Sequence, residues 1–105
     1  MKALFLTIVF AGALAAAGAP QTFNGVITDT LCGAKHNMSG HSDADCVKMC
    51  AKASGQYALF DGQNVMRLSD QKKPAQFAAE RVKVTGTYNK KTNTIKVSSI
   101  ESVRP

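Results

Sequence analysis

The chain has 105 residues, which is enough for one domain with a modest core and excludes large multidomain enzymes. Thirteen Lys and Arg against seven Asp and Glu give a formal net charge of +6 at pH 7. Because the basic residues are scattered or paired, as at Lys72-Lys73 and Lys90-Lys91, we expect a solvated surface rather than a dedicated arm for nucleic acid or anionic envelope surfaces.

The first residues have the pattern of a signal peptide. Lys2 precedes an apolar run over residues 3–17, and Ala15 and Ala17 fit an A-x-A cleavage site before Gly18. The run is about 15 residues, shorter than the ~20 that a membrane helix needs, so an uncleaved anchor is the weaker alternative. We therefore predict a signal peptide over 1–17 and a single domain over 18–105, in a periplasmic or secreted, oxidising location.

The mature chain is expected to open with a strand. Residues 22–30, TFNGVITDT, alternate polar and apolar side chains in part, and Gly25 suggests a bulge. From Cys32 to Ser42 the chain is rich in Gly, Asn, Ser and His, which is typical of a loop.

A short helix is predicted over residues 43–53. Ser42 is a good N-cap, and Asp45 follows it at the capping-box spacing, although Asp replaces the usual Glu. Acidic residues in the first turn suit the positive end of the helix dipole. Gly55 then favours the end of the helix.

A hairpin and a helical turn follow. Residues 56–60 and 64–69 supply two short strands, and Asp61-Gly62 between them is a strong turn signal. Pro74 is placed to begin a single helical turn, with Phe77 docking inward.

Two longer strands complete the chain. Residues 81–89, RVKVTGTYN, alternate cleanly until Gly86, which suggests a bend or bulge. Residues 94–103 form the last strand, and the phase shift between Val97 and Ile100 suggests a second bulge. The order of elements predicts a mainly β fold: a five-stranded, OB-like Greek-key barrel with a short helix after strand 1 and a helical turn between strands 3 and 4.

The strand segments also resemble a known kind of protein. VKVTGTYNKKTNTIKVSSIES over 82–102 is similar to the last two strands of small exported bacterial OB-fold proteins. FNGVITDTLCGAKH, CVKMC and QYALFDGQNVMRLSDQ resemble members with a Cys/His-containing insertion after the first strand. The resemblance implies the fold and export, and it brings no assigned catalytic residues.

Chemistry-bearing side chains gather between residues 31 and 50. This stretch contains all three cysteines, both histidines and two of the four methionines. The spacing is C-x3-H, nine residues, and then C-x3-C. Three uses of this cluster remain open: a disulfide, a metal site and thiol redox chemistry.

A disulfide would join Cys32 to Cys46 or to Cys50. The two helical cysteines are four positions apart, so their Cβ atoms lie about 6 Å apart, beyond the ~3.5–4.5 Å that a disulfide needs. Closing the loop of roughly 15 residues would stabilise the fold by about 3 kcal/mol. This account leaves one thiol unpaired, which is conspicuous in an oxidising compartment.

A metal site would use Cys32, His36, Cys46 and Cys50. Three thiolates and one imidazole suffice for tetrahedral zinc, and thiolates with thioethers also suit copper as Cu(I). The reserve ligands are His41, Met38 and Met49.

Other chemistry finds little support. C-x3-C is not the C-x-x-C of thioredoxin-like enzymes, and the sequence has no G-x-S-x-G, Walker loop or H-E-x-x-H. Nucleic-acid binding on strands 2 and 3 would use Tyr57, Phe60 and Arg67, but the two aromatic residues have opposite parity and cannot share one face. We therefore expect neither catalytic residues nor a nucleic-acid partner.

These observations predict a small envelope protein rather than an enzyme. The main hypothesis is an OB-fold binding or structural module, monomeric and without a membrane span after signal cleavage, whose loop and helix are fixed by cysteines and which takes an unidentified envelope ligand. The alternative is a periplasmic protein that binds zinc or copper, or performs thiol redox chemistry, through the Cys/His cluster.

Overall fold

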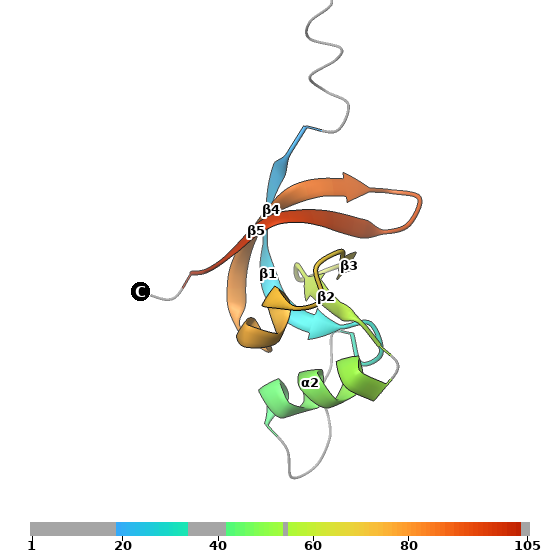
Figure 1. The fold of residues 1–105 in the computed structure, drawn as a ribbon, viewed down its shortest axis with the longest axis vertical. Helices are drawn as coiled ribbons and strands as arrows, with labels where there is room; N and C mark the ends of the chain where they lie inside the picture. Colours follow the sequence, from blue (N-terminus) through green and yellow to red (C-terminus); the bar gives the residue numbers. More distant parts are fainter. Residues whose placement is uncertain (1–18, 34–41, 54, 104–105) are drawn as a thin grey trace, which may run out of the picture.

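The computed structural model describes residues 19–33, 42–53 and 55–103 (Figure 1). It confirms a mainly β fold with five strands in one closed sheet and a helix after the first strand. The predicted signal peptide lies outside the described residues. The elements are β1 (Gln21–Asp29), α2 (Asp43–Ala53), β2 (Tyr57–Phe60), β3 (Val65–Leu68), the 3-10 turn η1 (Lys73–Phe77), β4 (Arg81–Asn89) and β5 (Thr94–Ser102).

The sheet closes because the first strand has two partners. The strand order is β1-β2-β3-β5-β4, and β1 pairs antiparallel with both β4 and β2. The β4 pairing runs through Gln21–Val26, and the β2 pairing runs from Val26 to Asp29. All neighbouring pairs are antiparallel except β3 with β5, which are parallel.

The bulge predicted at Gly25 is wrong. The pairing of β1 with β4 passes through Gly25 without a shift of register. A Cβ atom at this position would lie 2.4 Å from the carbonyl oxygen of Phe60. Glycine is needed because the β2 backbone approaches β1 closely where β1 changes partners.

The irregularity predicted in the last two strands is confirmed. The register shifts between Thr85, which pairs with Ser99, and Gly86, which pairs with Val97, so Ser98 is the extra residue of a bulge. A Cβ at Gly86 would lie 2.2 Å from the carbonyl oxygen of Lys96, because the two backbones converge there.

Alternating side chains fill the interior of the closed sheet. On β4, Val82 and Val84 are fully buried while Arg81 and Lys83 are exposed, as the sequence pattern predicts. The predicted docking of η1 is also confirmed, since Phe77 packs against this core. The buried core residues are Ile27, Leu59, Met66, Leu68, Val82, Val84, Ile95 and Ile100.

Helix α2 covers one end of the sheet and contacts β1 (Figure 1). The backbone N–H of Asp45 donates to Oγ of Ser42 at 3.1 Å, which confirms the predicted N-cap. Beyond the last turn, the N–H of Gly55 donates to the carbonyl of Cys50 at 3.0 Å, as expected at a helix end. The caps therefore fix both ends of the segment that carries two of the three cysteines.

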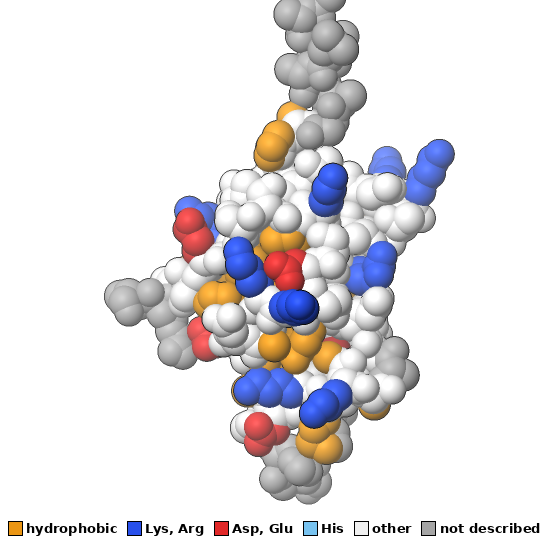
Figure 2. All heavy atoms as spheres, viewed as in Figure 1, with side chains coloured by type: hydrophobic (Ala, Val, Ile, Leu, Met, Phe, Trp, Pro, Cys, Tyr) orange, Lys and Arg blue, Asp and Glu red, His pale blue; other side chains and the backbone are white. Residues whose placement is uncertain are grey.

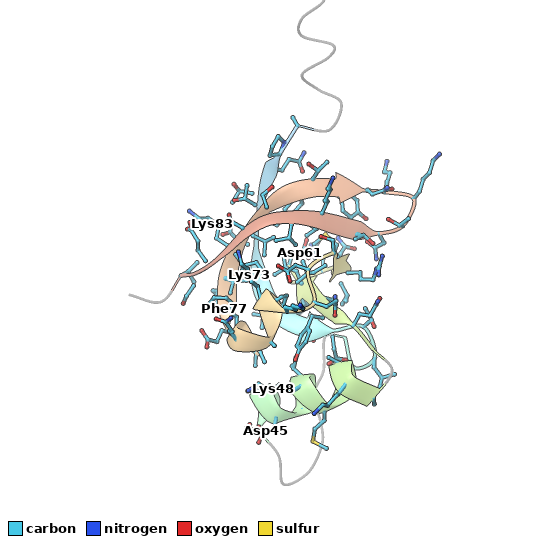
Figure 3. All side chains as sticks on the ribbon, viewed as in Figure 1. Asp45, Lys48, Asp61, Lys73, Phe77 and Lys83 are labelled. Atoms are coloured by element: carbon cyan, nitrogen blue, oxygen red, sulfur yellow. The ribbon has the colours of Figure 1, made fainter. Side chains whose placement is uncertain are left out.

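The charged side chains are distributed as the sequence suggests. On the face shown in Figure 2, Lys and Arg lie over both the sheet and the helix, with Asp and Glu between them. One ion pair joins Lys83 and Glu101 across β4 and β5, at 3.7 Å and in an exposed position (Figure 3). Within the described part of the chain, no helix has the length and apolar character that crossing a membrane requires.

Candidate metal centre

Three thiols from two segments meet beside the end of β1. The Sγ atoms of Cys32, Cys46 and Cys50 all lie within 4.8 Å of one another. The Sγ atoms of Cys32 and Cys46 are 4.0 Å apart. All three cysteines are unbonded in the structure.

A tight turn after β1 sets the position of Cys32. Asp29 is fully buried, and its Oδ1 accepts hydrogen bonds from the N–H of Leu31 at 2.9 Å and of Cys32 at 2.6 Å. The N–H of Gly33 donates to the Asp29 carbonyl at 3.0 Å, and Gly33 has the left-handed φ of 63° that closes such a turn. The hydroxyl of Thr28 donates to the Gly33 carbonyl at 2.5 Å. The turn is therefore held by side chains as well as by backbone.

Helix α2 carries the other two thiols of the cluster on its buried side. Cys46 and Cys50 lie one turn apart on the buried side of α2, with exposed fractions of 1% and 7%. Val47 is the other buried residue of the helix. A short amphipathic helix normally covers a core with large aliphatic side chains, whereas here two of the three buried residues are cysteines. Outward, Asp45 and Lys48 project from the same helix (Figure 3).

The surroundings raise the pKa of the Cys32 and Cys50 thiols. A hydrogen bond shared with Cys50, burial and the Asp29 carboxylate raise the pKa of Cys32 to about 12. The hydrogen bond with Cys32 lowers the pKa of Cys50, but burial and Asp29 outweigh it and raise that pKa as well. A neutral thiol is a poor nucleophile, so these raised pKa values make Cys32 and Cys50 less reactive than an ordinary thiol.

The separation of the sulfurs is compatible with one shared metal ion. An ion about 2.3 Å from each sulfur places the sulfurs about 3.8 Å apart in tetrahedral and about 4.0 Å apart in trigonal geometry. The sulfurs of Cys32 and Cys46 already have the trigonal spacing of 4.0 Å. A disulfide needs sulfurs at about 2.05 Å, so forming one requires a larger movement of the turn toward the helix.

Of the predicted ligands, the structure brings Cys32, Cys46 and Cys50 together. Three of the other predicted ligands lie outside the described residues: His36, Met38 and His41. Met49 lies on α2 next to Cys50 but is not one of the clustered ligands; its side chain is 43% exposed.

Sequence reasoning missed the part played by Asp29, which it treated as an ordinary strand-end residue. The sequence does contain a signal for this role. In an Asx turn, an Asp side chain accepts hydrogen bonds from the backbone amides two and three residues further along the chain. The third residue after Asp29 is Cys32. Sequence reasoning considered Arg67 as part of a nucleic-acid surface on strands 2 and 3 and did not favour that function. In the structure Arg67 instead donates internally, from Nε to Thr94 Oγ1 at 3.2 Å and from Nη1 to Gln56 Oε1 at 3.0 Å.

The remaining surface near the thiols is an apolar hollow. It has a volume of about 310 Å³ and is lined by Leu31, Met49, Cys50 and Ala53. The hollow therefore lies between the same two segments that supply the thiols, and one of the three thiols lines it.

Comparison with protein-family models, with curated proteins and with solved structures finds no match for this chain.

Proposed function

We propose that this protein binds a soft metal ion through Cys32, Cys46 and Cys50, on a small OB-like scaffold exported to the cell envelope. The closed strand order with parallel β3 and β5, and the helical turn before β4, support the OB-like assignment. Export rests on the signal-peptide pattern of residues 1–17. A fold alone does not imply a function, so the proposal depends on the residues of the site.

One observation carries the proposal: three sulfurs from two segments lie within 4.8 Å of one another. Thiolate sulfur is the ligand that zinc and Cu(I) favour. Two of the three buried residues of the helix are cysteines, so thiols occupy positions where aliphatic side chains would otherwise pack. A bound ion would tie the turn to the helix, so metal binding would stabilise the fold as well.

The rival function is that of a binding or structural module fixed by a disulfide. The 4.0 Å separation of Cys32 and Cys46 makes this pair one candidate for the bond. That bond would leave Cys50 as a free, buried thiol. The two functions therefore differ in what they require of Cys50.

Single substitutions to Ser at the three cysteines test the proposal. Each variant is purified under reductant and without oxygen, dialysed against Zn²⁺ or Cu(I), and analysed for metal per chain. The metal account predicts about one ion per chain for the native protein and a large loss of affinity for every variant. Val47→Ala is the matched control, because it weakens the same buried helix face without removing a thiol.

The disulfide account predicts a different pattern after oxidative purification. Cys32→Ser and Cys46→Ser would then lose stability, while Cys50→Ser would retain it and no protein would bind metal. If Cys50→Ser binds metal as tightly as the native protein, the three-thiol centre is wrong.

A further inference from the structure

We infer that the ion is Cu(I), and that it enters and leaves through the apolar hollow, with the thioether of Met49 as its first protein ligand. This inference rests on the proposed three-thiol centre. It adds the identity of the metal and the route of exchange.

The three thiols are not equivalent with respect to solvent. Cys46 is only 1% exposed and Cys50 is 7% exposed, whereas Cys32 is half-buried. Cys50 is the clustered cysteine that lines the hollow, together with Leu31, Met49 and Ala53. The clustered thiol that an ion in this hollow meets is therefore that of Cys50, beside the thioether of Met49.

The lining of the hollow selects against a hydrated dication. Among the described residues that line it, none carries an oxygen-bearing or charged side chain that could replace the water shell of Zn²⁺ or Mg²⁺. A thioether is neutral and soft, which favours Cu(I). Within the described residues, the three large apolar side chains that are most exposed are Leu31, Met49 and Val103. Two of these flank the hollow.

The set of clustered ligands also favours Cu(I). In the described residues, the clustered metal ligands are three cysteines, with no histidine or carboxylate among them. Thiolates are soft ligands, which suit Cu(I). The sulfurs of Cys32 and Cys46 are 4.0 Å apart and all three lie within 4.8 Å, so a small movement would bring them around one Cu(I) ion.

Exchange through the hollow involves no change of oxidation state. A bond forms between Cu(I) and Sδ of Met49 as one bond to the delivering chelator breaks. A bond to Sγ of Cys50 then replaces the thioether bond, and the thiol proton passes to water. Bonds to Cys32 and Cys46 follow in the same way, each thiol that becomes a thiolate releasing one proton, and the copper remains Cu(I) throughout.

The test measures the rate of copper exchange and the affinity separately. Cu(I) is loaded without oxygen and then withdrawn by bathocuproine disulfonate, whose copper complex absorbs visible light. Met49→Leu keeps the apolar volume and removes the sulfur. We expect Met49→Leu to slow the withdrawal of Cu(I) by the chelator about tenfold. This is the lower end of the effects of groups just outside a metal's ligand set. The equilibrium affinity for Cu(I) should change less than about twofold.

Two double variants control for the number of thioethers. Met49→Leu with Leu31→Met returns a thioether to the opposite side of the hollow and should restore the rate. Met49→Leu with Val103→Met places it at a remote position of matched exposure, 44% against 43%, and should remain slow. Equal rates for the native protein and Met49→Leu, or rescue by Val103→Met, would overturn the inference.

The choice of metal is tested by competition. Equal amounts of Cu(I) and Zn²⁺ are offered to the reduced native protein, and Cu(I) is expected to occupy the site. Preferential binding of zinc by all three thiols would overturn this inference and leave the proposed function intact. Binding of neither metal would overturn both.

Discussion

The carboxylate of Asp29 accepts the backbone N–H of Cys32 at 2.6 Å. The same carboxylate oxygen also accepts the N–H of Leu31. Asp29 is fully buried. A buried carboxylate at the exit of a strand therefore determines where the first thiol of the cluster lies.

Replacing Asp29 with Ala should weaken both the fold and the metal centre. Loss of two hydrogen bonds to a carboxylate, each worth about 1.5–3 kcal/mol, is expected to lower the free energy of unfolding by about 3–6 kcal/mol. Misplacement of Cys32 should reduce metal affinity about 10–100-fold. Urea unfolding and a competitive chelator titration measure the two effects.

Asp61 provides the matched control for that substitution. Its Oδ1 accepts the N–H of Gln63 at 2.8 Å and of Asn64 at 2.7 Å, which is the same pattern in the exposed β2–β3 hairpin. Asp61→Ala should leave metal affinity unchanged. Equal losses of affinity in the Asp29 and Asp61 variants would mean that general instability, not the position of Cys32, is responsible.

The stability of the metal-free, reduced protein should fall at alkaline pH because of Cys32. The pKa of this thiol rises from an ordinary 9.0 to about 12 on folding, first through its hydrogen bond with Cys50 and then through burial and Asp29. Below pH 9 both states hold the proton and the contribution to stability is complete. Between pH 9 and 12 only the unfolded state releases it, so the contribution is progressively lost.

Urea unfolding at several pH values, compared with Cys32→Ser, isolates this effect from the titration of Lys and Tyr. We expect the stability difference between the two proteins to shrink above pH 9. A difference that stays constant up to pH 11 would show that the folded thiol ionises at its ordinary pKa.

Gly25→Ala should disrupt the closure of the sheet. The added Cβ would lie 2.4 Å from the Phe60 carbonyl oxygen, which is backbone and cannot rotate away. We expect a loss of about 1–3 kcal/mol, as for overpacked sites. Gly62→Ala is the control: its φ of 105° strains a side chain, but nothing lies within 4 Å of the added Cβ.

Thermal unfolding of the two glycine variants distinguishes the causes. If Gly62→Ala is the more damaging substitution, backbone conformation outweighs the contact between β1 and β2, and our account of Gly25 is wrong.

The fold could be predicted from sequence to the extent that its signals are local. The capped helix over 43–53, the Asp61-Gly62 turn and the bulge between Val97 and Ile100 all depend on neighbouring residues, and the structure confirms them. Gly25 was misread because its reason is a contact with β2, more than thirty residues away, which periodicity cannot show.

The candidate site was predictable only in part, for the same reason. The one-turn spacing of Cys46 and Cys50 predicts a shared helix face, and the structure places both on the buried side. The approach of Cys32 depends on the Asx turn at Asp29 and on how α2 packs against β1. The hollow beside Met49 depends on the same packing, so the pattern alone could not indicate it.

The most direct test of the central claim is the X-ray absorption spectrum of the protein loaded with one equivalent of Cu(I) or Zn²⁺. We predict three sulfur neighbours at about 2.2–2.3 Å from the ion, all three lost as a set when Cys50 is replaced with Ser. A spectrum dominated by nitrogen or oxygen neighbours, or one that Cys50→Ser leaves unchanged, would contradict a centre built from these three thiols.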